Sequence, residues 1–186
     1  MTKRLFIAIK IDTSNSLLSI LESIKHDLHS ENIKWVDPHN LHLTLAFLGD
    51  TEDTMIDKII PVMDGISNNS SQFNIELNSL GVFKSFNFPS VIWFGFKPDF
   101  IMPGIKNALD LQLKNIGFTV EERKFTPHLT IGRIKNIVDK KNLQIVLNKF
   151  NNKEISKQIV KDITLYESIL TSNGPIYKMI HQSLLK

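Results

Sequence analysis

The sequence predicts an α+β fold built mostly from antiparallel sheet, and three observations lead to this prediction. Apolar runs typical of strands are interspersed with helical patterns without the strict alternation of a doubly wound fold. Segment 73–78 alternates apolar and polar residues, which favours antiparallel pairing with one solvated face. The phrase His-Leu-Thr occurs within apolar runs at 42–44 and 128–130, which predicts two similar strands and two similar lobes in one domain, 1–186.

The first half of the chain predicts three strands and two helices. An apolar, β-branched run predicts a strand over 5–11, and Ser14 or Ser16 then caps a helix that ends near residue 30. The buried stripe of this helix is formed by Leu17, Leu21, Ile24 and Leu28. The elements that follow are a strand at 33–36, a turn at 37–40, the first motif strand at 41–48, ended by Gly49-Asp50, and a helix at 51–66.

The second half predicts further strands and two helices. Strands at 73–78 and 91–96 precede a helix over 103–116, which has Pro103 in its first turn and Gly117 as its C-terminal cap. The remaining elements are the second motif strand at 126–134, a helix at 140–150, and strands at 159–170 and 177–184 joined by a turn at 172–175.

Composition limits the class of protein. The 186 residues are 42% hydrophobic and 22% charged, which is typical of a globular domain. A net charge of +3 favours polyanions such as RNA as partners, and the lack of cysteine excludes thiol catalysis, disulfides and cysteine-ligated metals. The N-terminal apolar run is too short for a signal peptide, and no run is long enough for a membrane span. We therefore expect a cytoplasmic protein without membrane contact. We also expect a monomer, although composition does not determine the oligomeric state.

The repeated motif predicts the chemistry. Because side chains on a strand alternate faces, His42 shares a face with Thr44, and His128 shares a face with Thr130. Two such strands facing each other would present one proton donor, one proton acceptor and two hydroxyls for an oxyanion. This set of groups is suited to phosphoester chemistry without a metal.

Arg133 is a further candidate, because a guanidinium can hold two phosphate oxygens at once. Strict alternation places it on the face opposite His128, so its use in the site requires a bulge or a strand end near Gly132. The alternative is an arginine on the surface. Phe47, Trp93 and Phe125 could stack on a base, although aromatic residues in apolar runs more often belong to the core.

Other histidines and motifs point away from metals and cofactors. His39 and His42 fall on opposite faces of an extended chain, and threonine is a poor ligand for the metals that histidine favours, so we expect no metal. His26 and His29 lie off the apolar stripe of their helix, which indicates a solvated face. No glycine-rich phosphate loop is present, so we expect no nucleotide cofactor.

Taken together, these motifs resemble the 2H phosphoesterases, and among them the bacterial and archaeal RNA 2′,3′-cyclic phosphodiesterases, also called 2′-5′ RNA ligases. The resemblance covers nearly the whole chain. It is carried by Arg4-Leu5-Phe6-Ile7-Ala8, Trp35-Val36-x-Pro38-x-Asn40-Leu41-His42-Leu43-Thr44-Leu45-x-Phe47-Leu48-Gly49, Val91-Ile92-Trp93-Phe94-Gly95, Phe125-x-Pro127-His128-Leu129-Thr130-Ile131-x-Arg133, Leu165-Tyr166-x-Ser168-x-Leu170 and Gly174-Pro175-x-Tyr177.

The resemblance implies a bilobal fold in which two mostly antiparallel sheets flank a central cleft, with helices outside. It implies hydrolysis of an RNA 2′,3′-cyclic phosphate to a 2′-phosphomonoester, with His42 as the acid, His128 as the base and Arg133 as a phosphate contact. Reversal would give 2′-5′ RNA ligation. Many members have a basic residue after the first motif where this chain has Ala46, so a phosphate contact made there is absent or comes from elsewhere.

Several alternatives stay open at this point. The motif is nearly symmetric, so exchanged histidine roles would yield a 3′-phosphate. The same chemistry could act on 2′-5′ linked oligonucleotides or small cyclic nucleotides. The same cleft could also bind RNA ends without turnover.

Overall fold

Two antiparallel sheets form the frame of the protein. The computed structural model describes residues 1–98, 100–120, 124–172 and 174–186. One sheet has the strand order β3-β1-β8-β9, and the other has the order β2-β6-β5-β4-β7. All the strand pairs within them are antiparallel, which confirms the predicted α+β class.

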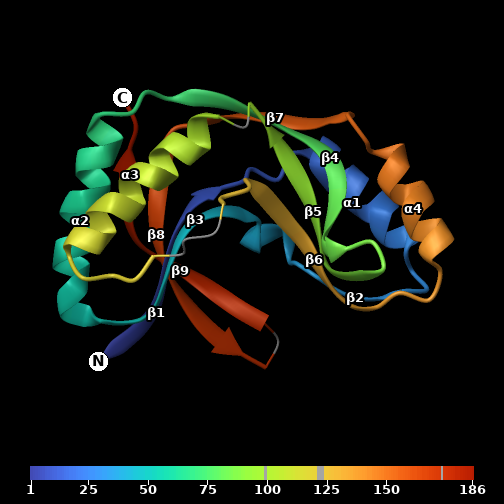
Figure 1. The fold of residues 1–186 in the computed structure, drawn as a ribbon, viewed down its shortest axis with the longest axis horizontal. Coiled ribbons are helices and arrows are strands. Elements are labelled where there is room, and N and C mark those ends of the chain that lie inside the picture. Colours follow the sequence, from blue (N-terminus) through green and yellow to red (C-terminus); the bar gives the residue numbers. More distant parts are fainter. Residues whose placement is uncertain (99, 121–123, 173) are drawn as a thin grey trace.

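The four-stranded sheet forms the first lobe, which lies on the left in Figure 1. Its strands are β1 (Thr2–Lys10), β3 (His42–Glu52), β8 (Asp162–Thr171) and β9 (Gly174–Leu184). Helices α2 (Asp53–Asn68) and α3 (Ile101–Asn115) cover its outer face. A short 3₁₀ turn, Pro38–Asn40, leads into β3. The other face of this sheet is therefore available for the cleft.

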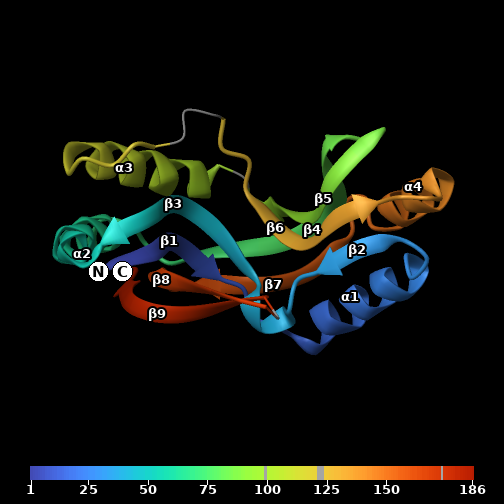
Figure 2. The same ribbon diagram turned by 90° about the horizontal axis from the view of Figure 1, so that it is seen from below.

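The five-stranded sheet forms the second lobe, at the opposite end of the molecule in Figure 2. Its strands are β2 (Asn32–Trp35), β4 (Phe73–Ser85), β5 (Phe88–Lys97), β6 (His128–Asn136) and β7 (Glu154–Val160). Helices α1 (Asn15–Asp27) and α4 (Lys140–Lys149) lie at this end. Since α1 comes from the first half of the sequence and α3 from the second, the two lobes are not the two halves of the chain.

Local signals place several elements as predicted. Ser14 caps α1, where its Oγ accepts a hydrogen bond from the Leu17 amide at 3.2 Å. The four apolar residues of the α1 stripe are at most 3% exposed. Gly117 follows α3 with a φ of +100°, a conformation that glycine adopts without strain and that ends the helix.

Three predicted strands differ from the structure by more than three residues at one end. Gly49 does not end the first motif strand, because its φ of +69° accommodates a bulge and β3 continues to Glu52. The predicted strand 159–170 is two strands in different sheets, β7 and β8, which separate at Lys161. The predicted strand 73–78 extends to Ser85, beyond a residue with positive φ, Ser79. In the predicted turn at 172–175, Asn173 lies outside the described residues.

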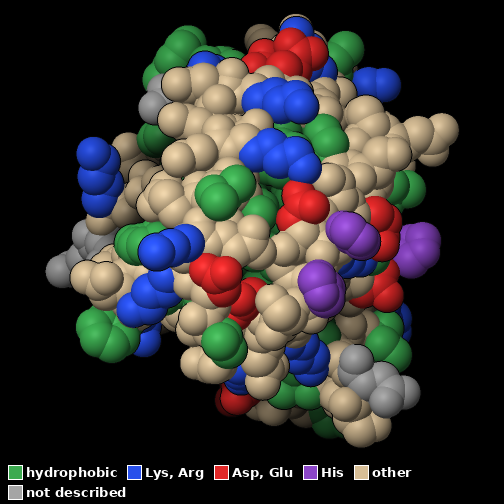
Figure 3. Space-filling view, turned by 90° about the vertical axis from the view of Figure 1, so that its right-hand side faces the viewer, with side chains coloured by type: hydrophobic (Ala, Val, Ile, Leu, Met, Phe, Trp, Pro, Cys, Tyr) green, Lys and Arg blue, Asp and Glu red, His purple; other side chains and the backbone are tan. Residues whose placement is uncertain are grey.

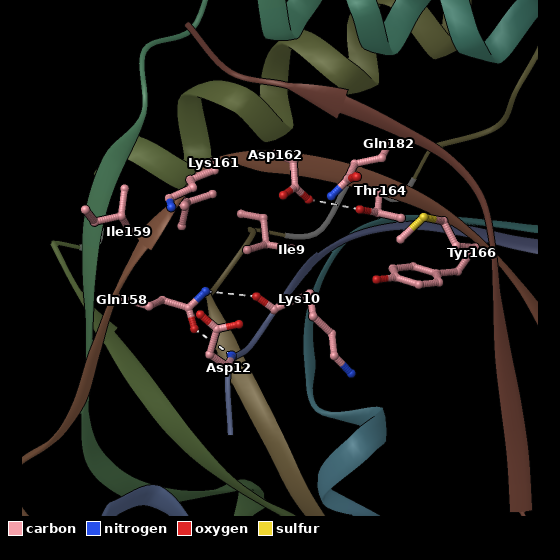
Figure 4. Close-up of a pocket in the computed structure, with 12 residues that line it drawn as sticks. Ile9, Lys10, Asp12, Gln158, Ile159, Lys161, Asp162, Thr164, Tyr166 and Gln182 are labelled. Carbon is pink, nitrogen blue, oxygen red and sulfur yellow. Dashed lines mark hydrogen bonds between the residues drawn. The ribbon is translucent and has the colours of Figure 1, made fainter. Parts of the chain in front are cut away.

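The side chain of Gln158 connects the two sheets. Its Oε1 accepts a hydrogen bond from the Asp12 amide at 2.8 Å, and its Nε2 donates to the Lys10 carbonyl at 2.9 Å (Figure 4). A primary amide here imitates the pairing of a neighbouring strand, because it supplies one donor and one acceptor. This contact fixes the end of β1 against β7.

The outer face of the second lobe carries mixed charge. Figure 3 views this end of the molecule, where histidines lie among acidic and basic side chains. His26 and His29 are both exposed, as the sequence predicts, and their ring centroids lie 6.0 Å apart. None of the helices in the described part of the chain has the length and apolar character that crossing a membrane requires.

Candidate active site

All five sequence-predicted site residues line one cleft between the lobes. The cleft has a volume of about 910 Å³, and its lining includes His42, Thr44, His128, Thr130 and Arg133. The first two come from β3 at the edge of the four-stranded sheet, and the other three come from β6 in the five-stranded sheet. The fold therefore brings together two motifs that are far apart in the sequence.

Both imidazole rings are oriented by a backbone carbonyl two residues earlier in the chain. Nδ1 of His42 lies 2.6 Å from the Asn40 oxygen, and Nδ1 of His128 lies 2.8 Å from the Thr126 oxygen. Because a carbonyl can only accept, each Nδ1 carries the hydrogen of its bond. In both residues Nε2 is then the nitrogen that can exchange a proton with a substrate.

His42 lies in an aromatic environment. Its ring centroid is 5.0 Å from that of Phe6 and 5.1 Å from that of Tyr177, which meets it edge-on at 88°. Burial lowers the pKa of His42, the positive charges of Lys10 and His128 lower it further, and the bond to Asn40 opposes this shift. A positive charge on His128 thus disfavours protonation of His42.

His128 lies against a different pair of aromatic rings. Phe83 meets it edge-on with a centroid distance of 4.6 Å, and Trp93 lies 6.5 Å away. Burial lowers the pKa of His128, while the hydrogen bond to Thr126 acts in the opposite direction. Both histidines are therefore poised to be neutral in a larger part of the pH range than an exposed histidine.

Arg133 reaches the cleft because β6 contains a bulge, one of the two irregularities that the sequence predicts near Gly132. Trp93 of β5 pairs with Thr130, but the preceding residue, Ile92, pairs with Gly132, so Ile131 is the extra residue. A bulge changes the face that the following side chains occupy. Gly132 is tightly enclosed, since a Cβ built there would lie 2.8 Å from Cγ2 of Ile33. The guanidinium of Arg133 thus joins the face of His128.

The aromatic candidates for base stacking differ in position. Phe47 lines the cleft and is 56% exposed. Trp93 stacks on Phe83, with centroids 5.0 Å apart, and supports His128. Phe125 is partly buried against the hydrophobic core. Only Phe47 combines exposure with a place on the cleft wall.

Sequence reasoning missed Arg4 and Tyr177 as cleft residues. Arg4 extends from β1, and its guanidinium lies 4.9 Å from the centroid of the Phe47 ring. Burial raises the pKa of the Tyr177 hydroxyl, whereas the charges of Arg133 and Arg4 lower it. Both residues belong to the family signatures in the sequence. For Arg4 the alternation of β1, in which it shares the face of Phe6, was a further signal.

A second cavity of about 260 Å³ lies between β7 and the four-stranded sheet and is lined by Lys10, Gln158 and Tyr166 among others, but by neither motif histidine (Figure 4). Within the described ranges, no three His, Asp or Glu side chains are grouped so that they could hold a metal ion.

Most of the chain matches a known family model, and several named proteins are similar to it over nearly its entire length. The family model described as LigT like Phosphoesterase matches residues 8–93 and 104–177. An RNA 2′,3′-cyclic phosphodiesterase from Methanocaldococcus jannaschii is 34% identical over 179 residues, which is 96% of this chain and 99% of that protein. An enzyme of the same name from Aquifex aeolicus is 34% identical over 176 residues, covering 93% of each chain.

Solved structures show the same fold. The crystal structure of TT0787 from Thermus thermophilus has a TM-score of 0.81 at 20% identity and covers 98% of this chain and 97% of its own. The structure of E. coli LigT complexed with 3′-AMP has a TM-score of 0.74 at 24% identity and covers 100% of this chain and 99% of its own. With the family match and the relatives above, these likenesses confirm the resemblance stated from the motifs. The chain belongs to the LigT-like phosphoesterase family.

Proposed function

We propose that this protein hydrolyses RNA 2′,3′-cyclic phosphate ends to a 2′-phosphomonoester without a metal or cofactor. The observation that carries the proposal is the pair of imidazoles in one cleft, each with Nδ1 bonded to a carbonyl and Nε2 left for a substrate. The names of the relatives from Methanocaldococcus and Aquifex support the choice of substrate. An RNA end is therefore the proposed partner.

The reaction begins with water positioned against phosphorus. Nε2 of neutral His128 takes a proton from this water as its oxygen attacks, and a new P–O bond forms. Protonated His42 gives its Nε2 proton to the 3′ oxygen as the P–O3′ bond breaks. The products are a 2′-phosphomonoester and a 3′-hydroxyl, and the two histidines end with exchanged protonation states. Positioned acid and base groups of this kind contribute about 10²–10⁴-fold each.

Three further side chains complete the proposed machinery. Thr44 and Thr130 project beside the two histidines and donate hydrogen bonds to the non-bridging oxygens as negative charge develops. Arg133 supplies a planar pair of donors and a positive charge for the same oxygens. If the 5′-hydroxyl of another RNA end replaces water as the nucleophile, a P–O5′ bond forms as the P–O3′ bond breaks, so that 2′-5′ ligation is a corollary of the same arrangement.

The test is turnover of a short RNA with a 2′,3′-cyclic phosphate end in the presence of EDTA, with identification of the product isomer. We expect the wild type to yield the 2′-phosphate, and we expect His42→Ala and His128→Ala each to lose activity by about 10²–10⁴-fold. His29→Ala is the matched control, because it removes an exposed imidazole from the outer surface.

Each other outcome contradicts a defined part of the proposal. Loss of wild-type turnover in EDTA would refute metal independence, and a 3′-phosphate product would exchange the histidine roles. Faster turnover of 2′-5′ linked oligonucleotides or small cyclic nucleotides would refute the proposed substrate class. Binding of the RNA end without turnover would show that the protein binds RNA ends and does not hydrolyse them.

A further inference from the structure

The two motif strands bulge at the same place. In β3 the register against β1 shifts from Ala8 opposite Thr44 to Ile7 opposite Ala46, so Leu45 is the extra residue. Leu45 stands three residues after His42, as the bulged residue of β6, Ile131, stands three residues after His128. The residue five positions after each histidine therefore reaches the cleft. In the second motif this is Arg133, and in the first it is Phe47.

Phe47 has no charge, but it holds a cation that comes from the neighbouring strand. The guanidinium of Arg4 lies 4.9 Å from the Phe47 ring centroid, a distance at which the ring face attracts a cation. A guanidinium stacked on a ring keeps its N–H donors in its own plane, where they can bind an anion. The first lobe thus provides a guanidinium that corresponds to that of Arg133. Arg4 supplies its charge, and Phe47 holds it in place.

The position of Arg4 differs from that of the reacting phosphate. Phe6 packs on His42 with a ring-centroid distance of 5.0 Å. Arg4 lies on the same face of β1, two residues before Phe6. Two residues of a strand span about 7 Å, close to the length of one extended nucleotide. Arg4, Arg133 and Tyr177 line the same cleft, and burial raises the pKa of the Tyr177 hydroxyl while the charges of Arg133 and Arg4 both lower it.

We infer that Arg4, supported by Phe47, forms a subsite for the phosphodiester on the 5′ side of the terminal nucleotide. The ligand class is an internucleotide phosphate, and the consequence is a preference for RNA ends over cyclic mononucleosides. This inference rests on the proposed function of the cleft. It also explains how the chain provides a basic contact near the first motif although Ala46 follows that motif.

The experiment compares two substrates that differ in this phosphate. One is a nucleoside 2′,3′-cyclic phosphate, and the other is a dinucleotide with the same end and one internucleotide phosphodiester. For Arg4→Gln we expect kcat/KM on the dinucleotide to fall about tenfold, as for a lost charged hydrogen bond. We expect the value on the mononucleoside to stay unchanged. The slope of log kcat/KM for the dinucleotide against log salt becomes shallower by about 0.7.

Lys178→Gln is the matched control for the loss of one charge. Lys178 is exposed on β9, next to Tyr177 but outside the lining of the cleft. We expect this variant to keep the wild-type ratio of the two substrates. A similar loss in Lys178→Gln would show a general effect of net charge and would overturn the inference. Equal losses on both substrates in Arg4→Gln would place Arg4 against the terminal nucleotide, and no loss on either would also overturn the subsite.

A binding measurement separates this inference from the proposed function. If the wild type turns over neither substrate, the proposed function fails, and the Kd values of a nucleoside 2′-phosphate and of the dinucleotide with the same 2′-phosphate are compared instead. The subsite predicts that Arg4→Gln weakens only the dinucleotide, by about tenfold. Equal Kd changes for both ligands would refute it.

Discussion

The Asn40 carbonyl oxygen lies 2.6 Å from Nδ1 of His42. The side chain of the same asparagine donates from Nδ2 to the Pro175 carbonyl at 2.9 Å. Pro175 belongs to β9, the strand whose Tyr177 meets the His42 ring edge-on. The orientation of this imidazole is therefore coupled to the β8–β9 hairpin through one residue.

Asn40→Ala should lower kcat/KM on a cyclic-phosphate RNA end about fivefold, the equivalent of one ordinary hydrogen bond. The backbone carbonyl that orients His42 is retained, but the bond to the hairpin is lost, so Tyr177 no longer holds its place. Steady-state kinetics measures the effect. Asn69→Ala is the control, because Asn69 also donates to a carbonyl, that of Gly65 at 2.7 Å, but at the end of α2. Equal kinetics for both variants would contradict the coupling.

The pH dependence of kcat/KM should be bell-shaped, with its maximum below pH 6.5. Burial lowers the pKa of both histidines below their usual value of 6.5. As pH rises, the acid His42 loses its proton already below that value, and as pH falls, the base His128 stays neutral to lower pH than an exposed histidine would. A rate that rises steadily from pH 5 to pH 8 would refute the two-histidine mechanism.

Lys10→Met should raise the pKa of His42 and leave that of His128 unchanged. Lys10 pairs with His42 in the register of β1 and β3, and its positive charge disfavours protonation of that ring. Among the causes of the His128 shift, Lys10 has no part. Titration of the two imidazoles by NMR measures both values in one sample, so His128 is an internal control. Shifts of equal size in both histidines would contradict this assignment.

Gly81→Ala should destabilise the protein by about 1–3 kcal/mol through overpacking. A Cβ at Gly81 would lie 2.5 Å from Cζ2 of Trp93, the ring that supports Phe83 and His128. Thermal unfolding should show Tm lowered by about 2–4 °C for each kcal/mol, with reduced turnover.

Gly65→Ala is the control for that substitution. Gly65 lies within α2 and has nothing within 4 Å of a built Cβ, so alanine should stabilise the helix by about 0.5–1 kcal/mol. If Gly81→Ala melted at the wild-type temperature, the close packing of Trp93 would not limit this position.

The sequence by itself determined the fold class, most of the elements and the five cleft residues that carry the motifs. It could do so because strand alternation, helix caps and the repeated His-Leu-Thr phrase are local patterns. The glycine before Arg133 was compatible with a bulge or a strand end, and the structure shows the bulge. Cytoplasmic location and a monomeric state stay predictions.

Only the tertiary structure decided which segments share a lobe and what surrounds the histidines. The separation of 159–170 into β7 and β8 depends on which sheet offers a free edge, and local residue preferences do not encode this. The placement of Arg4 on Phe47, of Tyr177 beside His42 and of Lys10 opposite it depends on strand register across long distances in the sequence. Register is set by packing of the whole sheet, so these contacts exist only once both lobes have assembled.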